Sequence, residues 1–143
     1  GELNAALVDV QKASRNCGGR FEFGYITKKE RKKDQRTGKK IRLPRFRRRP
    51  NPISDPFPVL EQAIRYWSEQ GGLPCDYPIL DDFEGRLEKF MKMLKAFVEA
   101  EVITQISDFG KDSDGAYAID HANEDFVLET ETYVFILHLG WSS

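Results

Sequence analysis

The sequence is poor in the two residue types that build disulfide frameworks and zinc sites. Its 143 residues include only two cysteines, Cys17 and Cys75, and two histidines, His121 and His138. Two cysteines cannot form a framework of several disulfides, and together with the histidines they show no metal-ligand spacing. We therefore expect unpaired thiols in a reducing, intracellular compartment, cytoplasmic or nuclear. We expect no bound metal and no cofactor.

Long hydrophobic runs are absent as well. The longest apolar run, about Tyr133–Leu137, is far shorter than the roughly 20 residues that span a bilayer. No charged and then apolar leader opens the sequence, so nothing in it indicates secretion. A protein without a membrane partner is the expectation. With 40% hydrophobic residues, the chain still has enough apolar side chains for a single domain with its own core.

Motifs that mark common enzyme sites are also missing. No glycine-rich phosphate loop is present, and Gly18–Gly19 and Gly71–Gly72 fit the ends of helices instead. His138 falls in an apolar segment, and no nucleophile or orienting acid can be assigned to it from the sequence. We expect it in the core or half-exposed. We name no catalytic residue and favour a protein without enzymatic activity.

What the sequence does have is positive charge concentrated in one segment. Residues 28–49 carry 13 basic and 2 acidic side chains, a net charge of +11, whereas the rest carries 9 basic and 21 acidic ones, a net charge of −12. The formal net charge of −1 therefore averages a basic segment and an acidic body. A surface that neutralises several phosphates gains affinity by releasing condensed counterions, and arginine can contact phosphate through two parallel hydrogen bonds.

This basic segment predicts a protein that binds DNA or RNA mainly through phosphates. Phe46 lies between arginines, where its ring could stack on a base or insert into a groove. No base-reading pattern accompanies it, so we expect low sequence specificity and a steep salt dependence. The residues expected to bind nucleic acid are Lys28, Lys29, Lys32, Lys33, Lys39, Lys40, Arg42, Arg45, Phe46, Arg47, Arg48 and Arg49.

Hydrophobic spacing predicts an α+β fold in one domain over residues 1–143. An N-terminal helix is expected over residues 2–15. Two central helices follow, one beginning at the N-cap and first-turn pair Asp55–Pro56. The other begins at Asp81, where Glu84 would complete a capping box.

The remaining segments predict strands. Residues 20–27 alternate aromatic with polar or small side chains, and residues 39–47 can return as their partner. These two strands would form a β-hairpin arm, with residues 28–49 projecting from the domain. Short connections predict a C-terminal antiparallel meander. Its strands are expected at 102–107, 115–120 and 126–141, with turns at 111–115 and 121–125.

Two alternatives from other functional classes stay open. Asp81, Asp82 and Glu84 could hold Mg²⁺ in a small metal-dependent nuclease, although helix capping explains the same residues. A non-enzymatic interaction module is the second alternative. Its basic and acidic faces would join it to a charged protein partner or to copies of itself as a homo-oligomer. The acidic C-terminal third more plainly fits the solvent face of a meander, where Glu129 and Glu131 lie two residues apart.

Overall fold

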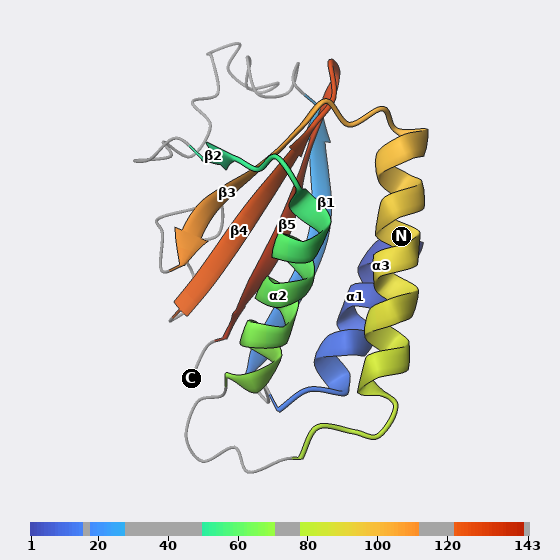
Figure 1. Cartoon of the computed structure of the whole chain (residues 1–143), viewed down its shortest axis with the longest axis vertical. Helices are drawn as coiled ribbons and strands as arrows, with labels where there is room; N and C mark the ends of the chain where they lie inside the picture. Colours follow the sequence, from blue (N-terminus) through green and yellow to red (C-terminus); the bar gives the residue numbers. More distant parts are fainter. Residues whose placement is uncertain (16–17, 28–49, 71–77, 112–121, 142–143) are drawn as a thin grey trace, which may run out of the picture.

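The structure is a computed structural model that describes residues 1–15, 18–27, 50–70, 78–111 and 122–141 (Figure 1). These residues form α1 (Glu2–Lys12), β1 (Gly19–Thr27), β2 (Asn51–Pro52), α2 (Pro56–Glu69), α3 (Phe83–Ala100), β3 (Gln105–Lys111), β4 (Ala122–Glu129) and β5 (Tyr133–Trp141). The predicted α+β class is confirmed, with a helix at the N-terminus and antiparallel strands at the C-terminus. α1 ends earlier than the predicted residue 15.

The strands form one antiparallel sheet in the order β1-β5-β4-β3-β2. Three successive strands, β3, β4 and β5, are neighbours, which confirms a C-terminal meander. β1 pairs with β5 along its whole length, from Gly19 opposite Trp141 to Thr27 opposite Tyr133. Among the described strands, β1 and β2 therefore occupy opposite edges of the sheet.

The boundaries predicted within the meander are wrong in two places. The segment 126–141 is not one strand, because it turns between β4 and β5. There the hydroxyl oxygen of Thr130 accepts hydrogen bonds from the backbone N–H groups of Thr132 and Tyr133, at 3.1 and 2.8 Å. The predicted turn at 121–125 is also wrong, since β4 begins at Ala122. The predicted strand at 115–120 lies outside the described residues.

The two central helices start close to where the sequence predicts them, but their caps differ. α2 begins at Pro56 with Asp55 at its N-cap, although the Asp55 side chain is not hydrogen-bonded to the described first turn. α3 has Asp82 at its N-cap, so the predicted capping box of Asp81 and Glu84 is wrong. Arginines pair with the Asp82 and Glu84 carboxylates instead, because a charged guanidinium makes stronger hydrogen bonds than a neutral backbone N–H.

The main core lies between the helices and one face of the sheet. Figure 1 shows α2 in front of the strands, with α1 and α3 beside each other. Every second side chain of a strand points to this face. The buried residues that meet there include Leu7 and Val10 of α1, Leu60, Ile64 and Trp67 of α2, Leu87, Phe90 and Leu94 of α3, and Phe126, Leu128, Leu137 and Leu139 of the sheet.

A smaller apolar cluster lies on the other face of the sheet. It consists of Phe109 of β3, Val127 of β4, and Val134 and Ile136 of β5, all buried. These residues alternate along the strands with those of the main core. Both faces of the central strands are therefore buried. In the part of the chain that the structure describes, no helix is long and apolar enough to cross a membrane.

Candidate functional site

The predicted nucleic-acid-binding residues, from Lys28 to Arg49, all lie outside the residues that the structure describes. The predicted partner strand at 39–47 lies outside them too. The structure does describe where the segment leaves and rejoins the sheet. β1 ends at Thr27, on one edge, and β2 begins at Asn51, on the other edge, where it pairs with Asp108 of β3. The basic segment is thus a connection held at both ends by strand pairing.

The nine basic side chains outside this segment are all described, and most have a partner inside the body. Every arginine among them pairs with a carboxylate, one lysine does so as well, and two further lysines lie over aromatic rings. These pairs are Arg15–Glu69, Arg20–Glu22, Arg65–Glu84, Arg86–Asp82 and Lys92–Glu88, with Lys95 over Phe57 and Lys111 over Tyr66. Lys12 and Lys89 are exposed.

Of the three acidic residues that the sequence offers as Mg²⁺ ligands, Asp82 and Glu84 are engaged in ion pairs, and Asp81 is exposed. The Glu84 carboxylate accepts hydrogen bonds from both terminal nitrogens of Arg65, at 2.6 and 2.8 Å, and this contact lowers the pKa of Glu84. Asp82 accepts a hydrogen bond from Arg86 at 2.8 Å. Among the described residues, no three His, Cys, Asp or Glu side chains are grouped so that they could hold a metal ion. The contacts of Glu84 tie α3 to α2.

A buried carboxyl group that the sequence did not single out lies between β4 and α2. Glu124 is 5% exposed, and one of its oxygens accepts a hydrogen bond from Nε1 of Trp67 at 3.1 Å. The pKa of Glu124 is raised to about 7, chiefly by burial and in addition by a hydrogen bond with the Asp108 carboxyl. Glu124 also lines a groove of about 490 Å³ between α2 and the sheet. It can therefore gain or lose a proton near neutral pH.

A second buried pair lies on the opposite face of the sheet. Nδ1 of His138 is 2.5 Å from Oδ1 of Asp125, and Oδ2 of Asp125 accepts a hydrogen bond from Asn123 at 3.1 Å. The histidine and the aspartate are both fully buried. One of the two atoms, Nδ1 or Oδ1, carries the hydrogen that joins them. The predicted core position of His138 is confirmed, and the structure supplies an acid that orients its ring.

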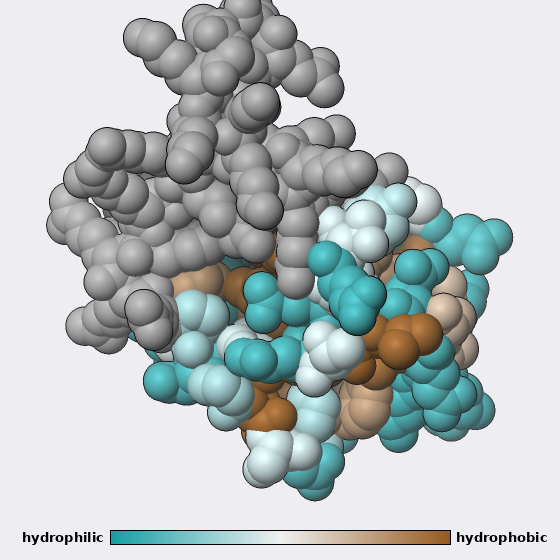
Figure 2. Space-filling view, turned by 90° about the horizontal axis from the view of Figure 1, so that it is seen from above, coloured by the Kyte–Doolittle hydropathy of each residue, from teal (hydrophilic) through white to brown (hydrophobic). Residues whose placement is uncertain are grey.

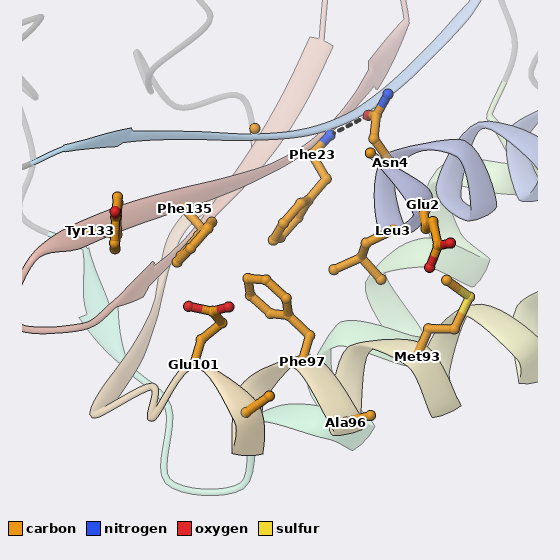
Figure 3. Close-up of a pocket in the computed structure, with 13 residues that line it drawn as sticks. Glu2, Leu3, Asn4, Phe23, Met93, Ala96, Phe97, Glu101, Tyr133 and Phe135 are labelled. Atoms are coloured by element: carbon orange, nitrogen blue, oxygen red, sulfur yellow. Dashed lines mark hydrogen bonds between the residues drawn. The ribbon is translucent and has the colours of Figure 1, made fainter.

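A third feature is an apolar cavity of about 730 Å³ bounded by α1, α3, β1 and β5 (Figure 3). Its wall contains Phe23, Phe97, Phe135 and Tyr133. The Phe97 ring meets those of Phe23 and Phe135 edge-on, with centroids 5.3 and 4.7 Å apart. The volume falls within the range of about 300–1,000 Å³ that is usual for small-molecule sites. The sequence places these aromatic residues in three separate elements and gives no sign that the elements bring them together.

No protein-family model, curated protein or solved structure matches this chain. Its chemistry is therefore inferred from its own residues.

Proposed function

We propose that this protein binds nucleic acid through residues 28–49, mainly by phosphate contacts and with little sequence preference. The observation that carries the proposal is a contrast in charge. Residues 28–49 hold 13 basic and only 2 acidic side chains, whereas each arginine of the body contacts a carboxylate. Positive charge that lacks carboxylates nearby in the sequence is the kind that phosphates neutralise, with release of counterions.

The attachment of the segment to the sheet adds support. Thr27 and Asn51 are fixed in strands at opposite edges, so the segment is not a terminal tail. A segment fixed at both ends has fewer conformations to lose on binding than a tail of the same length. A segment attached in this way favours a partner with regularly repeated charges, because it can bind such a partner at many equivalent positions. The phosphate backbone has this property.

The experiment that tests the proposal is a titration of labelled single- and double-stranded DNA and RNA of about 20 nucleotides, followed by fluorescence anisotropy. Wild type is compared with a variant in which Arg45, Arg47, Arg48 and Arg49 are changed to alanine. We expect the variant to bind about 100-fold more weakly at about 50 mM salt, because it loses four phosphate contacts.

A matched control removes the same charge from the body. Lys12, Lys89, Lys92 and Lys95 are exposed, and changing all four to alanine should alter affinity by less than about threefold. Circular dichroism confirms that each variant is folded. Equal affinity of the arginine variant and wild type, or no binding by wild type, would refute the proposal. Self-association that disappears at high salt, seen by light scattering without nucleic-acid binding, would favour the interaction module instead.

A further inference from the structure

We propose that the cavity between α1, α3, β1 and β5 binds a small organic cation, an alkylammonium compound with an apolar body. This inference does not depend on the proposed nucleic-acid binding, because it is argued only from described residues that line the cavity, and the basic segment lies outside the described residues. It rests on the aromatic wall, on the charge at the cavity mouth and on the way that α3 ends.

The wall of the cavity contains a cluster of three phenylalanine rings. Phe23 of β1 and Phe135 of β5 are stacked, with centroids 5.8 Å apart and planes 11° apart, and the Phe97 ring of α3 meets Phe135 edge-on. Phe23 and Phe97 are only partly buried. Figure 2, viewed from the end at which α3 finishes, shows hydrophobic patches between hydrophilic side chains on the described surface. Aromatic ring faces carry negative potential and attract ammonium groups within about 6 Å.

The charged side chains among the described residues that line the cavity are acidic, and the α-amino group of Gly1 lies there as well. The Glu101 carboxylate points into the space beside Phe97 and Phe135, and Glu2 lies on the other side, near Leu3 (Figure 3). Of the described residues that line the cavity, none is a lysine or an arginine. Nor does any described lysine or arginine side chain pair with Glu101. An anionic or neutral ligand would gain no attraction from the carboxylates of Glu2 and Glu101. The charge of the cavity therefore favours a cationic ligand.

The end of α3 lacks the positive charge that usually compensates a helix C-terminus. Its described last turn contains no basic residue, and Glu99 and Glu101 add negative charge there. The carbonyl groups at a helix C-terminus already carry a partial negative charge. Glu2, in contrast, lies in the first turn of α1, where a carboxylate is favoured by the helix dipole. The dipole of α3 thus disfavours the negative charge of Glu101, and a bound cation would neutralise that charge.

The backbone that holds Glu101 at the cavity is strained. The N–H of Ile103 donates to the carbonyl of Val98 at 3.1 Å, and the N–H of Val102 donates to that of Glu99 at 3.3 Å. This helix ending normally has glycine at the left-handed position, but Val102 occupies it with φ 53° and is 70% exposed. Strained backbone tends to occur at ligand sites. The strained turn fixes where Glu101 leaves the helix.

The test uses the two methionines of the chain as reporters in methyl NMR. Met93 lines the cavity, whereas Met91 is buried in the main core. The folded wild-type chain is titrated with hexyltrimethylammonium, with the uncharged 1-octanol and with octanoate. We expect the ammonium compound to shift the Met93 methyl signal but not that of Met91. It should bind about tenfold more tightly than octanol, and octanoate should bind most weakly.

Two variants distinguish a direct contact between Glu101 and the ligand from a general effect of negative charge at the end of α3. Glu101→Gln should weaken ammonium binding about fivefold and leave octanol binding unchanged. Glu99→Gln removes an equal charge from the same turn, but Glu99 does not line the cavity, so it should change affinity by less than about twofold. Both residues are exposed, so the substitutions should not unfold the chain. The inference is overturned if Met93 does not respond, if octanol binds as tightly as the ammonium compound, or if both variants lose affinity equally.

Discussion

The described body of the chain and the basic segment 28–49 differ in how far acidic side chains balance their basic ones. In the body, five of the nine cationic side chains pair with carboxylates and two more lie over aromatic rings. In the segment, 13 basic side chains face 2 acidic ones in the sequence. Charge that is paired within the fold contributes to structure, whereas the excess of positive charge in the sequence of residues 28–49 is the basis of the proposed binding of phosphates. The near-zero net charge of the whole chain conceals this division.

The body also contains two buried acidic side chains, and each is stabilised by a different kind of contact. Glu124 and Asp125 are neighbours on β4 whose side chains lie on opposite faces of the sheet. Glu124 accepts a hydrogen bond from Trp67 and has its pKa raised to about 7, whereas Asp125 pairs with His138. The two contacts predict different effects on stability when Glu124 or Asp125 is substituted.

The largest effect is expected at Asp125. Changing it to alanine leaves the ring of His138 and the amide of Asn123 without their buried acceptor. Removing one partner of a buried polar pair should lower the free energy of unfolding by about 3 kcal/mol. Urea denaturation measures this loss. As a control, Glu131→Ala in the exposed turn should change stability by less than about 0.5 kcal/mol. A loss below about 1 kcal/mol for Asp125→Ala would show that the pair is not structurally important.

A smaller and pH-dependent effect is expected at Glu124. Its pKa in the folded chain, about 7, lies above its ordinary value of 4.5. The folded state therefore holds the proton more tightly than the unfolded state. The stabilisation is present below pH 4.5 and is lost as the pH rises through 7. Glu124→Gln keeps a hydrogen-bonding side chain of similar shape without this ionisation. The full pKa difference corresponds to about 3 kcal/mol, and because an amide does not reproduce every contact of the carboxyl group, the variant should exceed wild type in stability by about 2 kcal/mol at pH 8.

The measurement at Glu124 is denaturant unfolding of both proteins between pH 4 and pH 8. The advantage of the variant should shrink toward zero at the acidic end of this range. Glu129→Gln, which removes a charge from the same strand, serves as the control and should show no such trend. A constant difference between Glu124→Gln and wild type across the range would contradict a raised pKa.

The smallest effect is expected for the exposed pair of Arg65 and Glu84. Their side chains are 37% and 68% exposed, so solvent screens most of the attraction. A double-mutant cycle with alanine at both positions should give a coupling free energy of about 0.5 kcal/mol, reduced further by high salt. A coupling above about 2 kcal/mol would mean that the surface pairs of the body contribute more to folding than their exposure suggests.

The sequence predicted the helices and the meander because their signals are local. Apolar residues at spacings of three and four mark α2 and α3, and the loss of that spacing after Glu101 marks the C-terminal strands. The turn at Thr130 escaped prediction because it contains no glycine or proline. A turn at Thr130, with the preceding strand extended back to Ala122, places His138 opposite Asp125, as in the observed register. The pairing of Asp125 with His138 could therefore have been predicted if the turn at Thr130 had been recognised.

The described sites could not be predicted because they are assembled from distant residues. Glu124 is buried by its contact with Trp67, which lies on another element. The cavity brings together Phe23, Phe97 and Phe135 from two strands and a helix. No periodicity encodes such contacts. The basic segment is the reverse case, because a run of charge is visible in the sequence whatever structure holds it.

The most direct test of the central claim is the salt dependence of DNA and RNA binding. The logarithm of the association constant, plotted against the logarithm of salt concentration, has a slope of about −0.9 for each phosphate neutralised on duplex DNA. We predict a wild-type slope steeper than about −4, and a slope shallower by about 3.6 when Arg45, Arg47, Arg48 and Arg49 are changed to alanine. The body variant with Lys12, Lys89, Lys92 and Lys95 changed should keep the wild-type slope. A slope that is the same in all three proteins would contradict phosphate binding by the basic segment.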